Sequence, residues 1–498
     1  MVQPIRRVAV IGAGVSGVTA AAHLKAADVQ VTLFERTNTS GGVWYVVFDP
    51  RVPPEPAYPS LIASVAETAY YEDAEDGNEE VVILHAPPGP CYELLTNNVP
   101  TGLMKITLNS WPPGTEQNVR HNILAEYIQD TAAKTGVNEV AHFNTKVEHV
   151  VKEGGHWKVQ TSTLDAGKLE KTNRDWEFDA VIVATGHYHA PKVPDIPGLK
   201  DWKKKWPSRI QHSKRYRSAR GFERKTVLLI GGSTSSTDIA KELGDIAKNI
   251  YQSTRGGLFD HPTSMLPPKA VRVSEIASFN LEQNSGSTLD DEPIPGTVTL
   301  VDGQVLTNID RVIICTGYHC TFPFLSQYHR DSVPATDADE TVLVTDGLQM
   351  HNLHKDIFYI PDPTLAFIGV PYYTATFSLF DFQAITVAAV FSGKAHLPTE
   401  TEMRAEYNQR VQEKGFGRIF HSLRGKDVDY VNELLAWINP SIVAAGGEPV
   451  EGHTKEWKEQ YAALREKFKA LLGDQPKPDV EKQNVEVLSE TAEAIEVH

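Results

Sequence analysis

Short apolar runs that end in glycine recur along the chain and predict buried strands of a parallel sheet. The first run, VAVI (8–11), leads into a glycine-rich turn, the helix-forming stretch TAAAHLKAA (19–27) and a second apolar run that ends in FER (34–36). The stretch that begins at residue 225, KTVLLIGGSTSSTDIAKELGDIAKNIYQSTR, repeats this plan. Strand, tight turn, helix and strand form a dinucleotide-binding βαβ unit, so the two copies predict an α/β protein with two Rossmann-like dinucleotide-binding domains.

Two further apolar runs end in Thr-Gly. They are EFDAVIVATG (177–186) and NIDRVIICTG (308–317). In an open parallel sheet, ligands bind outside the carboxyl ends of the strands, so we expect both ends to face a cofactor. The residues concerned are Thr185, Gly186, Thr316 and Gly317.

The remaining segments differ in composition. Residues 68–90 are acidic and then proline-rich, which predicts an exposed insertion, and residues 285–296 predict a loop. Residues 399–472 follow a mostly helical pattern, and the polar, acidic end of the chain predicts disorder. We expect the first dinucleotide domain in two parts with the second inserted between them. The expected boundaries are 1–203, 204–325, 326–475 and, for the acidic tail, 476–498.

Composition and charge narrow the class of protein. The chain has 498 residues, 41% hydrophobic and 22% charged, as in an ordinary globular protein. Its net charge of −16 disfavours nucleic acid or an anionic membrane as a partner. The three cysteines, Cys91, Cys315 and Cys320, form no disulfide framework and fit a reducing compartment. No apolar run is long enough for a signal peptide or approaches the ~18 residues of a membrane span, so we expect a cytoplasmic protein.

The first turn has the spacing Gly12-x-Gly14-x-x-Gly17 between a strand and a helix. Gly12 permits the tight turn, Gly14 lets the backbone approach a pyrophosphate, and Gly17 lets the helix pack closely on the strand. Glu35 ends the next strand, where its carboxylate can accept hydrogen bonds from ribose hydroxyls. This pattern suits FAD or another dinucleotide with a free ribose. The residues after Glu35 that we expect beside the same cofactor are Arg36, Gly42, Val43 and Trp44.

The second turn, GGSTSS (231–236), keeps only the first glycine of that spacing. Serine is small and its hydroxyl can donate to phosphate, although a Cβ at Ser233 crowds a pyrophosphate. Arg255 takes the place that Glu35 has in the first unit, and an arginine there suits the 2′-phosphate of NADP. A solvated surface arginine is the alternative. The expected contacts are Gly231, Ser233, Ser235, Ser236, Ser253 and Arg255.

Five longer motifs follow one another in a specific order. They are FERTNTSGGVW (34–44), YELLTNNVPTGLM (92–104), ATGHYHAPKVPDIPG (184–198), CTGYHCTFPF (315–324) and LAFIG (365–369). In sequence and order they resemble the flavin-containing monooxygenase family, whose members bind FAD and NADPH on one polypeptide. The resemblance covers roughly residues 6–400.

The fingerprint of that family is FxGxxxHxxx(F/Y), and WPSRIQHSKRY (206–216) resembles it in part. His212 and Tyr216 match, Trp206 replaces the phenylalanine and Ser208 replaces the glycine. The serine matters if its position needs a positive φ, so this departure concerns NADPH more than FAD. Tyr216 favours heteroatom oxygenation over Baeyer–Villiger chemistry. We expect a structural role for His212, with the stretch lining the junction of the two domains.

The resemblance implies a reaction and further site residues. NADPH reduces FAD, O2 adds to the flavin, and the resulting C4a-hydroperoxyflavin oxygenates the nitrogen of an amine or the sulfur of a sulfide in a small molecule. The family's active-site asparagine falls on Asn98, expected to bind the nicotinamide or peroxide region by its amide. A purely turn-shaping role is the alternative. Further cofactor contacts are expected at Thr96, Asn97, Val147 and Gln383.

Other functions stay open. A Baeyer–Villiger monooxygenase acting on a ketone is the enzymatic alternative, and a non-catalytic FAD-binding redox sensor is the other, because the second site departs at three serines. A disulfide reductase is disfavoured, since no cysteine follows Gly41-Gly42. No histidine cluster has metal-ligand spacing, so no metal is expected. We expect solvated loop histidines at His187, His189, His351 and His354. A homo-oligomer is neither predicted nor excluded.

Overall fold

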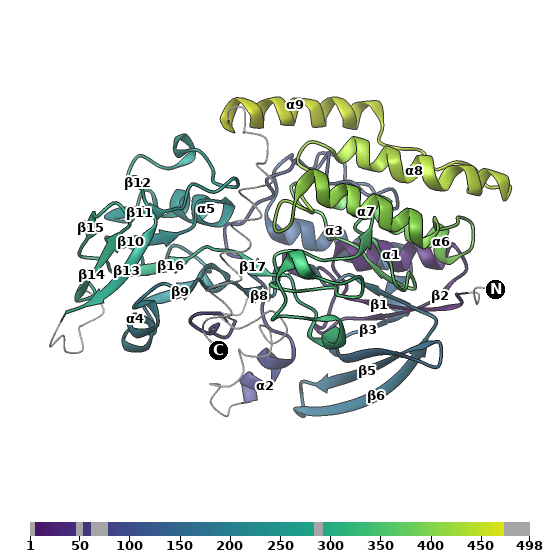
Figure 1. The fold of residues 1–498 in the computed structure, drawn as a ribbon, viewed down its shortest axis with the longest axis horizontal. Helices are drawn as coiled ribbons and strands as arrows, with labels where there is room; N and C mark the ends of the chain where they lie inside the picture. The colour runs from purple at the N-terminus through teal and green to yellow at the C-terminus, as the bar shows by residue number, and fades with distance from the viewer. Residues whose placement is uncertain (1–4, 46–52, 61–77, 283–291, 473–498) are drawn as a thin grey trace.

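The computed structural model describes residues 5–45, 53–60, 78–282 and 292–472, and two parallel sheets organise them (Figure 1). The first sheet has seven strands in the order β18-β19-β20-β7-β1-β2-β3. Strands β20 to β3 run parallel, whereas β18 and β19 form an antiparallel edge. The strands are β1 Arg7–Ile11, β2 Gln30–Phe34, β3 Ala141–His142, β7 Ala180–Val183, β18 Leu353–His354, β19 Phe358–Tyr359 and β20 Leu365–Phe367.

Both faces of this sheet are covered, which explains why its central strands are apolar throughout. Helices α1 (Val15–Ala26), α3 (His121–Lys134) and α6 (Thr376–Phe391) supply apolar side chains to the core on one face. Almost every α6 side chain is buried, as expected for a helix that is hydrophobic all round. On the other face lies an antiparallel sheet of β4 Thr145–Glu153, β5 His156–Asp165 and β6 Glu170–Phe178.

The second parallel sheet has the order β12-β11-β10-β16-β9 and consists only of residues between 210 and 314. Helix α5 (Thr234–Leu243) follows its central strand β10, as α1 follows β1 in the first sheet. Helix α4 (Leu199–Lys205) and a three-stranded antiparallel sheet contribute to a core with it. The strands are β9 Ile210–His212, β10 Thr226–Ile230, β11 Asn249–Ser253, β12 Ala270–Val273, β13 Ile276–Leu281, β14 Gly296–Leu300, β15 Val305–Leu306 and β16 Arg311–Ile314.

The chain passes between the two sheets twice, and the two passages pair with each other. Strand β8 (Ala190–Pro191) leads toward the second sheet, and β17 (Tyr318–His319) leads back. They form a two-stranded antiparallel sheet, Tyr318 opposite Pro191 and His319 opposite Ala190. The two connections are therefore held side by side where the ligand-facing ends of both sheets meet.

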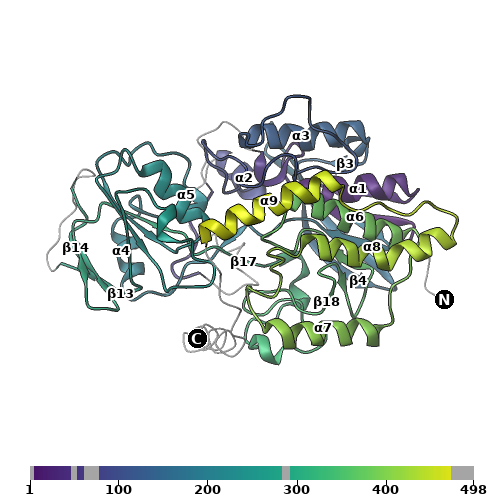
Figure 2. The same ribbon diagram turned by 90° about the horizontal axis from the view of Figure 1, so that it is seen from above.

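The C-terminal part is helical, as predicted, with α7 (Glu400–Lys414), α8 (Asp427–Ala444) and α9 (Lys455–Leu472). Thr399 and Glu402 form a capping box that explains where α7 begins. Seen from above, α9 runs from the α8 side across toward α5 (Figure 2). No helix in the described ranges is long and apolar enough to cross a bilayer.

The remaining short elements are 3-10 helices and one insertion helix. The 3-10 helices are η1 Gly42–Trp44, η3 Val137–Glu139, η4 Ser213–Arg215, η5 Thr263–Met265, η6 Pro323–Tyr328 and η7 Ala335–Asp337. The predicted acidic tail and most of the predicted loop at 285–296 lie outside the described residues. The insertion predicted at 68–90 is described from residue 78, where it forms α2 (Asn78–His85). The expectation of exposure is wrong for His85, whose side chain is buried.

Candidate cofactor and active site

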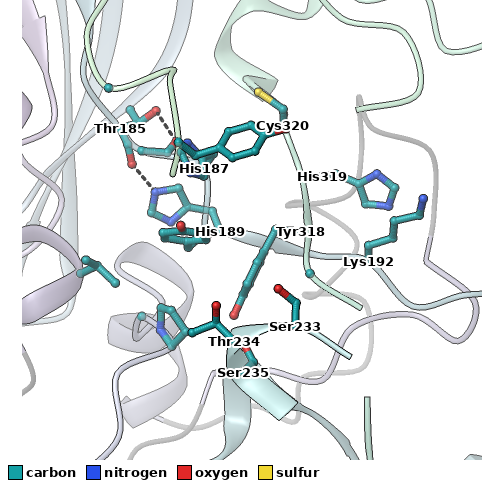
Figure 3. A pocket seen from close by; sticks show the side chains of 18 of the residues that line it. Thr185, His187, His189, Lys192, Ser233, Thr234, Ser235, Tyr318, His319 and Cys320 are labelled. Carbon is teal, nitrogen blue, oxygen red and sulfur yellow. Dashed lines mark hydrogen bonds between the residues drawn. The ribbon is translucent and has the colours of Figure 1, made fainter. Parts of the chain in front are cut away.

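Residues of both glycine turns line one continuous cleft, which has a volume of about 2960 Å³. Of the residues predicted to bind a cofactor, most line it, at the carboxyl ends of strands from both sheets. These are Gly12, Gly14, Glu35, Arg36, Gly42, Val43, Trp44, Thr96, Val147, Thr185, Gly186, Gly231, Ser233, Ser235, Ser253, Arg255, Thr316 and Gly317. Figure 3 shows residues of the junction, where the Tyr318 ring points from β17 toward Thr234 and Ser235 of the second turn.

The first turn requires its glycines. Gly12 has a φ of +103°, and a Cβ there would lie 2.7 Å from the carbonyl oxygen of Ala184 on the neighbouring strand. A Cβ on Gly17 would collide with the Gly12 carbonyl, so Gly17 serves packing and does not line the cleft. Gly42, with a φ of +56°, faces Gly14 so closely that a Cβ on it would lie 2.8 Å from the Gly14 Cα. The two bare backbones thus pack directly against each other in the cleft wall, where neither presents a side chain to a ligand.

Glu35 joins this turn to the end of β2. Its carboxylate accepts hydrogen bonds from the backbone N–H of Ala13 at 2.7 Å and from that of Thr37 at 2.8 Å. The Thr37 hydroxyl also donates to it, at 2.9 Å. Although only 8% exposed, Glu35 lines the cleft, at the place that a ribose occupies in such folds.

The second turn repeats the first with one change. Gly231 has a φ of +116°, and a Cβ there would lie 2.5 Å from the carbonyl oxygen of Cys315, as Gly12 faces Ala184. Ser233 and Ser235 line the cleft, but Ser236 does not. The prediction that Ser236 contacts a phosphate is wrong, because its buried hydroxyl donates to the Ser233 carbonyl at 3.0 Å and accepts from the Gln252 amide at 2.9 Å.

Arg255 lines the cleft two residues beyond the end of β11, and the predicted strand is therefore slightly too long. Ser253, the last residue of the strand, donates its hydroxyl to the Ser274 carbonyl at 2.8 Å. That hydroxyl is engaged in holding the strand end, while Arg255 presents a positive charge and Asp260, beside Gly232, a carboxylate to the same edge of the cleft.

Two adjacent asparagines have opposite surroundings. Asn98 is exposed in the cleft wall and makes no hydrogen bond within the described residues. Asn97 is buried, donates to the carbonyls of Val99 and Gln117, and accepts from the Val119 N–H at 2.6 Å. The prediction of Asn97 as a cofactor contact is wrong, because its amide is used up in folding the loop that presents Asn98.

The prediction of Gln383 as a cofactor contact is also wrong. It lies fully buried in α6, accepts from the Gly369 N–H at 3.0 Å and donates to the Tyr430 hydroxyl at 2.8 Å. It therefore fixes Gly369, where an added Cβ would lie 2.7 Å from the Ser16 hydroxyl of the first turn. Gln383 supports the cleft from behind and does not line it.

The fingerprint stretch lies outside the cleft wall. Trp206, His212 and Tyr216 are buried, and the Tyr216 hydroxyl donates to Glu242 at 2.6 Å. His212 accepts from the Lys214 N–H, and burial lowers the pKa of its imidazole to about 3. These contacts support the structural role expected for His212. Ser208 is exposed and has no positive φ, so its replacement of glycine causes no strain.

The histidines divide into two groups. His351 and His354 are buried, and burial lowers their pKa to about 3 and about 4, so the prediction of solvated loops is wrong for both. His187 and His189 line the cleft, and His189 Nδ1 lies 2.7 Å from a guanidinium nitrogen of Arg36. Within the described ranges, no group of three or more potential ligands is arranged to hold a metal ion.

An aromatic wall, which the sequence does not reveal, lines the cleft between the sheets. It consists of Tyr188, Phe259, Tyr318, Tyr372 and Tyr373. Phe259, from the second domain, stacks on Tyr373, from the loop before α6, with centroids 5.2 Å apart. The exposed guanidinium of Arg424 lies 4.6 Å from the Tyr373 centroid. Only tertiary structure brings these segments together, because they are far apart in the sequence.

Comparison with known proteins gives consistent matches over most of the chain. Three family models match: pyridine nucleotide-disulphide oxidoreductase at 98–360, flavin-binding monooxygenase-like at 294–444, and NAD(P)-binding Rossmann-like domain at 10–57. The flavin-containing monooxygenase ustF2 of Aspergillus flavus is 48% identical over 487 residues, which cover 94% of this chain and 98% of that protein. The flavin-containing monooxygenase iboF of Amanita muscaria is 32% identical, with 90% of each chain covered.

Among solved structures, S-allyl-L-cysteine S-oxygenase from Allium sativum superposes with a TM-score of 0.69 at 24% identity, covering 99% of both chains. Tmm from Pelagibacter sp. strain HTCC7211 superposes with a TM-score of 0.59 at 21% identity, covering 98% of this chain and 91% of that one. At these identities the superpositions establish the fold, with its two Rossmann-like domains.

Proposed function

Since this chain belongs to the flavin-containing monooxygenase family, we propose that it is an FAD- and NADPH-dependent enzyme that oxygenates the nitrogen of an amine or the sulfur of a sulfide in a small molecule. One observation carries the proposal: both dinucleotide turns open into one cleft, and Asn98 stands in its wall. NADPH supplies two electrons, one atom of O2 enters the substrate, and the other leaves as water.

The residues of the first turn fit FAD. Gly14 and Gly42 line the cleft without side chains that would crowd a pyrophosphate, and the N-terminus of α1 would face its charge. Glu35, which lines the cleft, would accept hydrogen bonds from ribose hydroxyls. When bound, FAD passes the two electrons of a hydride from NADPH to O2.

The second turn would hold NADPH through the same features as the first. Gly231 keeps the tight turn, and α5 begins directly after Ser233, so its free N–H groups face the cleft. Arg255 would bind the 2′-phosphate, which distinguishes NADPH from NADH.

The side chains of the cleft would orient the reactants and exclude water. The Asn98 amide, with no partner among the described residues, is available to donate and accept hydrogen bonds there. The rings of Tyr372 and Tyr373 present apolar surface that keeps water from the reacting atoms. No general base is needed, because an amine or a sulfide attacks with its own lone pair.

A cytoplasmic location and a small-molecule partner complete the proposal. The net charge of −16 supports the absence of a nucleic-acid partner.

Two measurements test this function. Anaerobic NADPH is expected to bleach the flavin absorbance of the purified holoenzyme, and no bleaching would contradict a monooxygenase and favour an FAD-binding sensor. In air, a panel of amines, thioethers and cyclic ketones is then offered with NADPH. An N-oxide, hydroxylamine or sulfoxide product is expected, whereas a lactone as the only product would replace the proposal with Baeyer–Villiger chemistry.

A further inference from the structure

His85, the last residue of α2, has one ring nitrogen engaged and one without a partner. Its side chain is 1% exposed, yet it contributes to the wall of the cleft. Nε2 lies 2.9 Å from the backbone carbonyl oxygen of Asn144. Nδ1 is buried and has no hydrogen-bond partner within the described residues.

These contacts determine which nitrogen carries the proton. A carbonyl oxygen only accepts, so Nε2 must be the N–H donor to Asn144. Burial lowers the pKa of the ring, which is therefore neutral at pH 7. In the neutral ring with a protonated Nε2, Nδ1 bears a lone pair and is an acceptor. Because buried acceptors are normally paired, we expect Nδ1 to accept from a donor that the described residues do not supply.

The position of His85 indicates the donor. Asn144 immediately precedes β4, whose Val147 lines the cleft, while Arg36 and Asn38 follow Glu35. With the pyrophosphate at Gly14 and the ribose at Glu35, the adenine of FAD lies beyond Glu35, among these residues.

Two charged groups of this part of the wall, Lys146 and Glu148, are paired with each other. Lys146 Nζ lies 2.8 Å from a carboxylate oxygen of Glu148, which also accepts from the Ser162 hydroxyl at 2.5 Å. They do not require a ligand charge, which agrees with an uncharged base as the occupant.

We propose that His85 Nδ1 accepts a hydrogen bond from the exocyclic amino group of the adenine of FAD, so that α2 closes the adenine site and selects the base. This inference rests on the proposed FAD site. Helix α2 would then take part in recognising the cofactor. Adenine presents an N–H donor to the acceptor, whereas hypoxanthine carries an oxygen at the same position and would place acceptor against acceptor.

The test compares two cofactors on the full chain after removal and re-addition of flavin. FAD and its hypoxanthine analogue are titrated, and the dissociation constant of each is measured by flavin fluorescence. The wild type is expected to bind FAD about tenfold more tightly than the analogue, the size expected for one buried hydrogen bond. His85→Phe is expected to bind both equally, and His85→Gln, which keeps an acceptor, to retain part of the preference.

The ratio separates recognition from folding. A purely structural role of His85 would weaken both cofactors alike and leave their ratio unchanged. His149→Phe, on strand β4 near the His85 contact with Asn144 but outside the cleft wall, is the control and should keep the wild-type ratio. An equal affinity of the wild type for both cofactors would overturn the assignment of His85 alone, while failure of the wild type to bind any flavin would overturn the proposed function with it.

Discussion

The indole N–H of Trp457 donates a hydrogen bond to the backbone carbonyl of Leu103, at 3.2 Å. Trp457 lies on α9, and Leu103 lies in the loop that presents Asn98. One turn further along α9, Tyr461 donates to Asp427, which accepts from the Ala375 N–H at 2.7 Å just before α6. Helix α9 is thus attached to two loops that approach the first dinucleotide site, and it continues across toward α5 (Figure 2).

This attachment predicts that Trp457→Ala disturbs both stability and the cleft. Truncating a buried aromatic side chain costs about 3 kcal/mol or more, so the melting temperature should fall by several degrees. Loosening the Leu103 loop should also admit water and raise the share of NADPH oxidation that ends in hydrogen peroxide. Phe468→Ala, at the exposed end of the same helix, is the control for stability alone, because that side chain also lines the cleft. Equal effects of the two variants on melting temperature would contradict the anchoring role of Trp457.

Alanine substitutions of the neighbouring Asn97 and Asn98 are expected to have different effects. Asn98→Ala removes an exposed amide from the cleft wall, so it should leave melting temperature and bound FAD unchanged while raising peroxide release severalfold. Asn97→Ala removes three hydrogen bonds in a buried loop, where each unpaired group costs about 1–3 kcal/mol, and should lower the melting temperature. Melting curves and a peroxide assay on both variants check this, and unaltered coupling in Asn98→Ala would refute its role.

The two turns can be predicted from sequence because a local backbone constraint requires their glycines. Gly12 and Gly231 have φ values of +103° and +116°, and each faces a carbonyl on the neighbouring strand, so only glycine fits. A run of apolar residues before such a glycine therefore indicates both the strand and the ligand-facing edge of its sheet.

The errors concern side chains whose surroundings come from distant segments. Asn97 and Asn98 are equivalent in sequence, and only the packing of residues 117–119 decides which is buried. Gln383 is engaged by Gly369 and Tyr430, and no local pattern predicts that pairing. The aromatic wall is invisible in the sequence for the same reason.

Two serines that replace family glycines give a contrasting pair. Ser236→Gly removes the hydroxyl that accepts from the buried amide of Gln252, so it should destabilise the second domain by about 1–3 kcal/mol. Ser208→Gly changes an exposed residue without a positive φ and should cost at most about 1 kcal/mol. Thermal unfolding measures both. A large change in NADPH affinity for Ser208→Gly would contradict the placement of this residue outside the cleft.

Arg255 offers a test of cofactor choice. If its guanidinium binds the 2′-phosphate, Arg255→Ala should raise the KM for NADPH about tenfold or more and leave that for NADH nearly unchanged. Arg220→Ala, whose side chain is largely exposed and outside the cleft wall, serves as the control and should change neither. Steady-state kinetics with both nucleotides decide the matter, since equal effects on the two would remove the 2′-phosphate assignment.

The buried histidines predict a loss of stability on acidification. Burial lowers the pKa of His212 and of His351 to about 3, against about 6.5 in an unfolded chain. Between these values the unfolded state binds protons that the folded state excludes. The stabilisation is therefore complete above pH 6.5 and is lost as the pH falls toward 3.

The melting temperature of the wild type should thus decrease between pH 7.5 and pH 5, and His212→Asn should decrease less. Asparagine does not titrate, and its side-chain oxygen can replace Nδ1 as acceptor for the Lys214 N–H. Both proteins are compared by thermal unfolding across this range, with pH 7.5 as the reference at which their melting temperatures should be closest. Identical slopes against pH would show that His212 is not kept neutral by its burial.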